Sequence, residues 1–416
     1  MSINRSSEVI RTARSMGLVL VLLFLSWTAG RMGFASLLSA YAARSNRIDA
    51  ANAAVQLNAS DAEAHYIRAA ILEFNNDPVA ANAEYVQAVI LHPFDYVVWL
   101  ALAHTRELNG DINGAIDAAG EATRLAPFYA QPHWQLGNLL VRAGRSSKGF
   151  DELRLAAASN PSLRPAIIDL AWQLSHGDVD YVRRVIQPET AEESIDVAEY
   201  FKKHGKFAEA VDVIRVAGAP ADEYCRRFTA ELISAKRFQD AYTLWSIGHP
   251  RDSNSATLTD GGFEQPSDLD EPGFGWRANK TPNVMLSLHG TNPKEGKSSL
   301  KVEFNGDSDP KLPIITQLVN VEPRAHYKLL FAVRTEELIS GGLPGLKIFD
   351  PAAGQSLAQS GAFPTMSRGW QDYAVEFVIP EGASTIQIVL QRELCKNSPC
   401  PIFGRLWLDN FSLQKQ

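Results

Sequence analysis

The segment 290–298 (GTNPKEGKS) comes closer than any other part of the sequence to a phosphate-binding loop. Such a loop places four residues between its first glycine and the Gly-Lys pair, so that backbone N–H groups surround the phosphates, and a helix follows it. Here five residues separate Gly290 from Gly296, and the residues that follow have the character of a strand. We therefore expect no nucleotide-binding loop.

Other catalytic patterns are missing from the sequence. The nine histidines are scattered, and none has the His-x-x-x-His spacing of a zinc protease. The sequence has neither a Gly-x-Ser-x-Gly nucleophile elbow nor a dinucleotide fingerprint. The acid pairs 192–193 and 336–337 fall on expected solvated faces or turns. We expect a protein that is not an enzyme and requires no cofactor.

Two of the three cysteines could form a disulfide. Cys395 and Cys400 are close enough in the sequence for a small disulfide loop before the last strand, and two reduced thiols are the alternative. A disulfide requires an oxidising compartment, so it would place this part of the chain outside the cytoplasm. Cys225 lies in an amphipathic helix and is expected to be a buried apolar residue.

Length and charge limit the classes of protein to which the chain can belong. The chain has 416 residues, enough for two or three domains, and its 45% hydrophobic content is that of a globular protein. The net charge is −7, and no region carries the excess of Lys and Arg that phosphate contacts require. We expect no nucleic-acid partner.

The N-terminal segment predicts a membrane anchor. After a tail at 1–16, the segment 17–43 begins with the uncharged run Gly17–Gly30, in which residues 18–25 are all Leu, Val or Phe. Only 16 residues separate Arg14 from Arg31, which is about 24 Å of helix. A bilayer core is about 30 Å thick, so the later uncharged residues must contribute to the span as a helix extension.

A cleaved signal peptide is the alternative for this segment, because it has a basic start and an apolar centre. The cleavage pattern Ala40-Tyr41-Ala42 lies far beyond the apolar run, and Thr28-Ala29-Gly30 matches only loosely. We favour an uncleaved single-pass anchor with the bulk of the chain outside the cytoplasm, in the periplasm. The flanking arginines are balanced and do not decide the orientation.

A repeat of 34 residues follows the anchor. Three windows, 62–95, 96–129 and 130–163, have small residues at offsets 8, 20 and 27 and proline at offset 32. Small residues are required where two helices approach closely, and proline ends the second helix of each pair. The pattern resembles the tetratricopeptide repeat family, which implies antiparallel helix pairs stacked into a solenoid. Degenerate repeats extend this solenoid to 46–248, about six helix pairs.

The resemblance also implies where a partner binds. In this family, offsets 5 and 9 of each first helix face a concave groove. The matching positions here are Tyr66, Ala70, Leu100, His104, Trp134, Asn138, Ile168 and Trp172. They lack the Lys, Asn and Arg set that clamps a C-terminal carboxylate in some relatives, and they suit a hydrophobic segment of a partner protein instead. The alternative is that Trp134 and Trp172 pack against a neighbouring helix.

The hydrophobic period changes to two after a polar linker at 250–259. We expect strands at 299–305, 314–321, 326–334, 373–379, 385–391 and 405–413, separated by turn residues. This pattern is typical of an antiparallel sandwich. The predicted fold class is therefore multidomain: a transmembrane helix, an all-α solenoid and an all-β sandwich over 260–416.

The sandwich sequence is similar to carbohydrate-binding modules of the family 4/9 type. The similarity is carried by 261–264 (GGFE), Trp276, 295–302 (EGKSSLKV), 369–377 (GWQDYAVEF) and 406–410 (LWLDN). It implies a jelly roll of the galactose-binding-like fold.

The same similarity suggests two kinds of site. It makes Glu264 and Asp409 candidate ligands of a structural calcium ion, because carboxylates are the oxygen ligands that calcium prefers; surface acids at strand ends are the alternative. Trp407 alternates with Leu406 and Leu408, so we expect it to face outward as a single platform for a sugar.

Taken together, the sequence predicts a membrane-anchored interaction protein of the bacterial envelope or of exopolysaccharide assembly. It would bind protein partners through the groove and a polysaccharide through the sandwich. The alternatives are a scaffold that binds only proteins and an accessory of a carbohydrate-active enzyme.

Overall fold

The computed structural model describes residues 3–218, 222–249, 258–265, 269–270, 272–396 and 399–416. It separates into two compact units, Met1–Gln187 and Pro188–Gln416, and each is described by itself. The expected order of elements, helices followed by an antiparallel sandwich, is confirmed. Residues 250–257 of the predicted linker lie outside the described residues.

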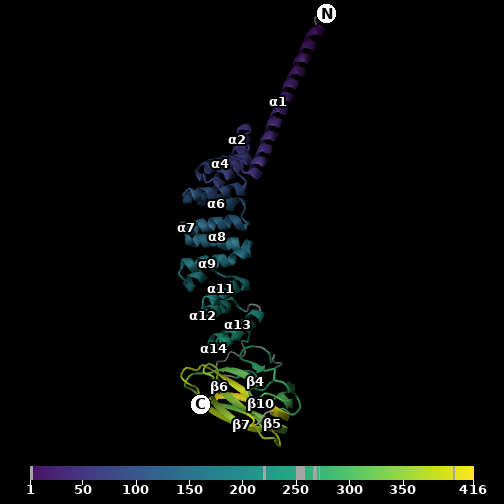
Figure 1. Ribbon diagram of the computed structural model, residues 1–416, viewed down its shortest axis with the longest axis vertical. Coiled ribbons are helices and arrows are strands. Elements are labelled where there is room, and N and C mark those ends of the chain that lie inside the picture. Colours follow the sequence, from purple (N-terminus) through teal and green to yellow (C-terminus); the bar gives the residue numbers. More distant parts are fainter. Residues whose placement is uncertain (1–2, 219–221, 250–257, 266–268, 271, 397–398) are drawn as a thin grey trace. The chain divides into compact units, whose positions relative to one another are not determined.

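The first unit consists of a long helix and paired helices. The long helix α1 spans Ile3–Ser45, and α2 spans Ile48–Leu57. The three clear repeats form the pairs α3 (Ala62–Phe74) with α4 (Pro78–Leu91), α5 (Tyr96–Leu108) with α6 (Ile112–Leu125), and α7 (Ala130–Arg142) with α8 (Ser146–Ser159). A short 3-10 turn (Pro161–Leu163) leads into α9 (Arg164–Leu174) and α10 (Val179–Ile186). Figure 1 shows the pairs α3 to α8 stacked in sequence order, with α1 projecting away from them.

The small residues of the repeat lie where the two helices of a pair approach each other. A Cβ atom added to Gly137 in α7 would lie 2.9 Å from the carbonyl oxygen of Gly149 in α8, and one added to Gly149 would lie 2.9 Å from the carbonyl oxygen of Gly137. The other positions of this kind are the buried alanines Ala69, Ala103, Ala81, Ala115, Ala88, Ala122 and Ala156. The 34-residue period therefore reports backbone contact between paired helices.

A hydrogen bond to the loop before each first helix also recurs with the 34-residue period. Trp99 donates from Nε1 to the carbonyl oxygen of Pro93 at 2.9 Å. His133 replaces this tryptophan in the next repeat, and its Nε2 lies 2.9 Å from the carbonyl oxygen of Pro127, while its Nδ1 lies 2.6 Å from Glu152. His65 occupies the same position in the first repeat, with Nε2 3.2 Å from the carbonyl oxygen of Ala59 and Nδ1 2.7 Å from Glu84. Each ring thus fixes the loop that joins two repeats.

The second unit begins with four helices. They are α11 (Ala191–Lys203), α12 (Phe207–Ala217), α13 (Asp222–Ser234) and α14 (Phe238–Gly248). In α11, Thr190 and Glu193 form a reciprocal capping box that satisfies the first backbone N–H groups. These four helices lie within the range 46–248 for which the sequence predicted degenerate helical repeats. The helix α10 was not predicted as a separate element.

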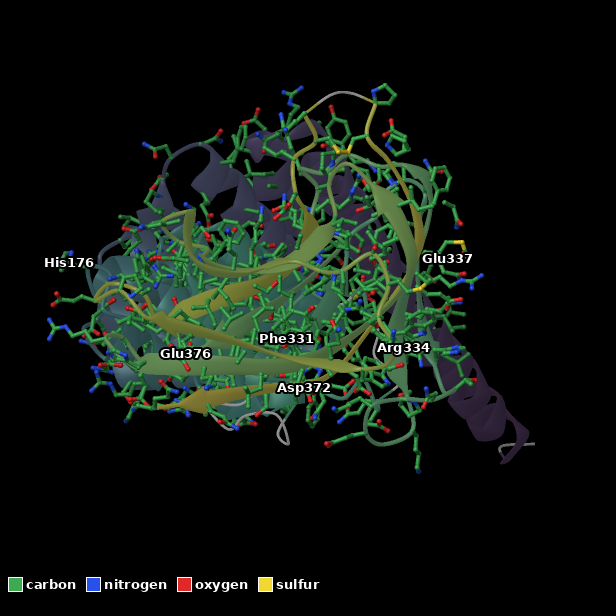
Figure 2. The ribbon with its side chains drawn as sticks, turned by 90° about the horizontal axis from the view of Figure 1, so that it is seen from below. His176, Phe331, Arg334, Glu337, Asp372 and Glu376 are labelled. Atoms are coloured by element: carbon green, nitrogen blue, oxygen red, sulfur yellow. A yellow bond between two sulfur atoms is a disulfide. The ribbon has the colours of Figure 1, made fainter. Side chains whose placement is uncertain are left out.

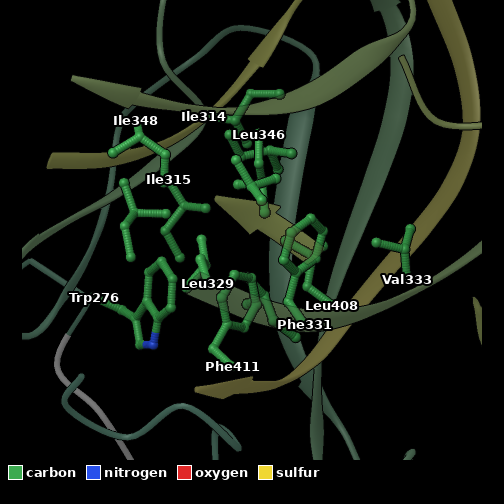
Figure 3. Close-up of a cluster of buried hydrophobic side chains, with 14 of the residues drawn as sticks. Trp276, Ile314, Ile315, Leu329, Phe331, Val333, Leu346, Ile348, Leu408 and Phe411 are labelled. Carbon is green, nitrogen blue, oxygen red and sulfur yellow. The ribbon is translucent and has the colours of Figure 1, made fainter. Parts of the chain in front are cut away.

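Ten strands among the described residues form two five-stranded antiparallel sheets. One sheet has the order β1 (Trp276–Ala278), β4 (Ile315–Asn320), β9 (Thr385–Arg392), β6 (Pro344–Asp350) and β7 (Gln355–Ala362). The other has the order β2 (Val284–His289), β3 (Ser299–Asp307), β10 (Pro401–Lys415), β5 (His326–Ser340) and β8 (Gln371–Val378). Buried side chains from both sheets fill the space between them, among them Trp276, Phe331 and Phe411 (Figure 3).

The predicted strands correspond to β3, β4, β5, β8, β9 and β10, while β1, β2, β6 and β7 were not predicted. The edge strand β7 has mainly exposed and half-buried residues, so its sequence lacks an alternating apolar pattern.

The last helix pair packs against the sandwich. The ring of Phe274, just before β1, lies 4.9 Å from Tyr242 and 5.8 Å from Trp245, both in α14. A Cβ atom on Gly273 would lie 2.3 Å from Trp245 Cδ1, so only glycine permits this approach. Lys236, between α13 and α14, donates from Nζ to the carbonyl oxygen of Ala352 at 2.8 Å. These two helices are thus part of the same compact unit as the sheets.

Candidate functional site

An open groove on the first helices of three consecutive repeats is the candidate site of the first unit. Its volume is about 510 Å³. Five of the residues predicted from offsets 5 and 9 line it together: Tyr66, Leu100, His104, Trp134 and Asn138. The remaining lining residues are Val97, Ala101, Glu107, Gln131, Gln135, Leu139 and Arg142. The 34-residue period thus brings side chains from α3, α5 and α7 onto one surface.

An acidic residue organises one part of the groove. The carboxylate of Glu73 accepts a hydrogen bond from the Thr105 hydroxyl at 2.7 Å, and it lies 3.5 Å from Nε2 of the exposed His104. Burial raises the pKa of the Tyr66 phenol, and the negative charges of Asp95 and Glu73 raise that pKa further. Tyr66 therefore stays a neutral hydrogen-bonding group with an aromatic face at physiological pH.

Polar side chains join neighbouring helices across the groove. Gln135 in α7 donates to the carbonyl oxygen of Leu100 in α5 at 3.1 Å, and Arg142 forms an ion pair with Glu107. Asn138 donates from Nδ2 to the carbonyl oxygen of Trp134 at 2.8 Å, which orients its amide. The half-buried ring of Trp134 thus lies among groups that can accept and donate hydrogen bonds, an arrangement that suits an extended peptide. The groove is more polar than the apolar surface expected from the sequence.

The other predicted groove residues lie elsewhere. Trp172 is not among the lining residues; its ring packs over the turn at Gly177, where an added Cβ would lie 3.1 Å from the indole. Ile168 is buried in α9, and Ala70 does not line the groove. For Trp172 and Ile168, the reason is that a 3-10 turn precedes α9 and the clear 34-residue period ends before this helix.

The seven remaining lining residues were not predicted: Val97, Ala101, Glu107, Gln131, Gln135, Leu139 and Arg142. The signal for several of them is present in the sequence, because residues 97, 100, 101 and 104 in α5, and residues 131, 134, 135 and 138 in α7, follow the i, i+3, i+4, i+7 spacing of one helix face. The family resemblance indicates only offsets 5 and 9, so it does not predict the neighbouring positions of this face.

The prediction that Trp407 forms an exposed platform is wrong. Trp407 lies on the outer face of β10, as the alternation with Leu406 and Leu408 indicates, but it is only 4% exposed. The Arg334 guanidinium lies 4.2 Å above its ring, and Lys301 and His289 lie beside it. Figure 2 labels Arg334 on β5 and Asp372 on the neighbouring strand β8. Facing outward is therefore not the same as being exposed, because long side chains of adjacent strands cover this indole.

The two candidate calcium ligands hold the loop 290–298. The carboxylate of Glu264 accepts hydrogen bonds from the backbone N–H groups of Lys297 at 2.8 Å and Ser298 at 3.2 Å. Asp409, which is fully buried, accepts from the N–H groups of Lys294 at 2.7 Å and Glu295 at 3.3 Å. A calcium ion requires a shell of oxygen ligands, whereas these carboxylates face N–H donors. The groups around these two carboxylates therefore do not fit a calcium site.

Burial raises the pKa of the Asp409 carboxyl, while its backbone hydrogen bonds oppose that shift and Glu264 adds to it. No group of three or more His, Cys, Asp or Glu side chains within the described ranges is placed to hold a metal ion. The segment that comes closest in sequence to a phosphate loop thus has its N–H groups at 294, 295, 297 and 298 occupied by carboxylates of the chain itself.

The structure joins Cys395 and Cys400 in a disulfide, and a buried arginine holds this loop. Arg392 donates to the carbonyl oxygens of Gly342 at 3.1 Å, Ser308 at 2.6 Å and Cys400 at 2.8 Å. It also donates to the hydroxyl of Ser340 at 2.7 Å. Among the described residues, no carboxylate forms a hydrogen bond with this guanidinium, whose donors these oxygens satisfy, and burial lowers its pKa.

No family model matches the chain, and no curated protein matches it. Among solved structures, the chain is similar to MamA, at 15% identity and a TM-score of 0.28 over 41% of this chain and 84% of that chain. It is also similar to YrrB, described as a TPR protein with an unusual peptide-binding site, at 18% identity and a TM-score of 0.30 over 40% and 93% of the two chains. A third similarity, at 17% identity and a TM-score of 0.26 over 38% and 97%, is to TmCBM61 in complex with beta-1,4-galactotriose.

These similarities are too distant to carry an argument, so the class of protein follows from the geometry described above. The chain is a helical-repeat protein whose stacked helix pairs precede an antiparallel two-sheet sandwich.

Proposed function

We propose that the chain is a non-catalytic scaffold that captures an extended segment of a partner protein in the groove of α3, α5 and α7. The observation that supports this proposal is the convergence of Tyr66, Trp134, His104 and Asn138, from three repeats, on one open groove. The aromatic faces suit apolar side chains of the segment. The imidazole and amide groups suit its backbone, which must exchange its hydrogen bonds to water for new ones.

We propose further that α1 anchors this scaffold in a membrane. Met16–Ser45 is long and apolar enough to cross a bilayer, and its large apolar side chains from Met16 to Trp27 are exposed. Cleavage after Ala42 would remove Ala35 and Ala42, which are fully buried against the following helices. This packing supports an uncleaved anchor.

The disulfide supports a location outside the cytoplasm, because a Cys395–Cys400 bridge persists in an oxidising compartment such as the periplasm. The buried Trp407 offers a polysaccharide no stacking platform. We therefore place the binding activity in the helical groove, which corresponds to the scaffold that binds only proteins.

The groove is tested by selecting peptides from a displayed random library on the purified full chain and measuring their affinity for variants. We expect Trp134→Ala to weaken a selected peptide by about tenfold or more, the size of a binding hot spot. Phe128→Ala is the matched control, because Phe128 is 86% exposed and does not line the groove.

Two results would contradict the proposal. In the first, peptides bind both variants as tightly as they bind the unchanged chain. In the second, Trp134→Ala lowers the free energy of unfolding by about 3–5 kcal/mol, the cost of removing a core tryptophan.

A further inference from the structure

The helix α1 has two parts that differ in what covers them. From Met16 to Gly30, its large apolar side chains are exposed on all sides. From Ala35 onward one face packs against α2 and α3, with Ala35, Ser39 and Ala42 buried. The helix continues through this change without interruption. The second part of α1 therefore serves as the first helix of an additional pair with α2.

The packed part of α1 has a second, apolar face that no described residue covers. Phe34, Leu37 and Tyr41 are 57%, 68% and 51% exposed, and their i, i+3, i+7 spacing places them on one side of the helix. We call these three residues the outer stripe. The end of a helical-repeat stack normally has a polar outer face. The outer stripe is apolar instead, so it requires a different covering.

The length of the apolar run indicates what that covering is. The 16 uncharged residues between Arg14 and Arg31 span about 24 Å, which is about 6 Å less than a bilayer core. About four further residues must therefore enter the hydrocarbon, which extends the span to Phe34. Leu37 then lies at the edge of the core, and Tyr41 lies at the interface, where tyrosine is enriched.

Arg31 is the only charged residue within this extended span, and the structure provides a partner for it. Its Nε donates to the carbonyl oxygen of Leu57, the last residue of α2, at 2.5 Å. A helix C-terminus carries unpaired carbonyl groups and a partial negative charge, which stabilise a cation. Arginines near helix ends commonly extend their side chains to the lipid headgroups. Arg31 does not need to do so, because α2 holds it.

We propose that the first helix pair is partly embedded in the membrane, with the bilayer covering the outer stripe of Phe34, Leu37 and Tyr41. This inference rests on the proposed anchoring and adds to it a depth and an orientation. The membrane surface then lies at the α1–α2 pair, and no flexible linker separates the span from the helical repeats.

The experiment measures depth in vesicles of phosphatidylcholine that contain the full chain. Cys225→Ser provides a background without a free thiol, since Cys395 and Cys400 are joined. A nitroxide is attached to Leu37→Cys, to Leu22→Cys within the apolar run, and to Ser147→Cys at an exposed site of α8. Frequent collisions of the nitroxide with oxygen indicate that it lies in lipid, and frequent collisions with a water-soluble nickel chelate indicate that it lies in water.

We expect the labels at Leu37 and Leu22 to collide with oxygen often and with nickel severalfold less than the label at Ser147. If the label at Leu22 reports lipid and that at Leu37 reports water, the chain is anchored but the stripe is not embedded, and this inference fails alone. If Leu22 also reports water, the anchoring fails as well. If Leu37 is shielded from both reagents and shows spin–spin broadening, a second copy of the chain covers the stripe, and the inference is overturned.

Discussion

At the scale of single residues, two carboxylates, the buried one of Asp409 and the exposed one of Glu264, hold the loop 290–298. Asp409 and Glu264 accept backbone N–H groups there, where the sequence suggested metal ligation. The two roles predict opposite effects of pH. Burial raises the pKa of Asp409, so ionisation of this group costs free energy in the folded state. A bound divalent cation would favour the ionised form and lower the pKa.

We therefore predict how the difference in free energy of unfolding between the unchanged chain and Asp409→Asn depends on pH. A carboxyl whose pKa is raised by folding contributes its full stability below its unfolded pKa, about 3.9, and loses that contribution as pH rises through the folded value. The measurement is urea unfolding of the chain without residues 1–30. The advantage of Asp409 over asparagine, which is the difference between the two chains in free energy of unfolding, should be largest near pH 3 and decrease toward neutral pH. An advantage that increases with pH would indicate a cation at this site, and a metal chelator would then reduce it.

A second residue-scale prediction concerns the ring that fixes each inter-repeat loop. His133→Ala removes contacts to Pro127 and Glu152 and leaves a partly buried carboxylate without its partner. We expect the free energy of unfolding to decrease by about 2–4 kcal/mol. His92→Ala is the control, because His92 is exposed and 3.8 Å from Asp95, a pair worth less than about 1 kcal/mol. Equal effects of the two substitutions would contradict a structural role for His133.

At the scale of elements, the spacing of small residues determines how closely paired helices approach. Gly137 and Gly120 are both helical glycines, but an added Cβ at Gly137 would meet Leu153 Cγ at 2.7 Å, whereas one at Gly120 would meet nothing within 4 Å. Gly137→Ala should destabilise the unit by about 1–3 kcal/mol through overpacking.

Gly120→Ala should instead stabilise it by about 0.5–1 kcal/mol, because alanine has the higher helix propensity. Thermal unfolding of both variants measures the difference. A stabilising Gly137→Ala would show that α7 and α8 do not approach as closely as described.

The elements that the sequence predicted are those with a strong local pattern. The three 34-residue repeats and the strands with alternating burial fall in this group. The helix α10 and the edge strand β7 were missed, because one is a single short amphipathic element and the other buries little. The groove residues Tyr66, Leu100, His104, Trp134 and Asn138 were found because their period brings them onto one surface. The burial of Trp407 could not be predicted, because it depends on side chains of strands that are distant in sequence.

At the scale of the whole chain, the polar segment 250–259 suggested a boundary between solenoid and sandwich, whereas the compact units divide at Gln187 and Pro188. Helices α13 and α14 belong with the sheets. Leu318 lies on the outer face of β4, is only 7% exposed, and lines the same cavity as Ile233 and Phe238 of these helices. Removing the helix pair would therefore expose apolar surface of the sandwich that these helices normally cover.

This arrangement predicts that a fragment of residues 188–416 is more stable than the sandwich alone, residues 258–416. Without α14, Phe274 loses Tyr242 and Trp245, and Leu318 becomes exposed. The lost burial of a few apolar side chains is worth several kcal/mol, which lowers the melting temperature by about 5–10 °C for a domain of this size. Trp245→Ala in the longer fragment should reproduce part of the decrease, because it removes the same contact while keeping the helices. Equal melting temperatures of the two fragments would show instead that the polar segment separates two independent domains.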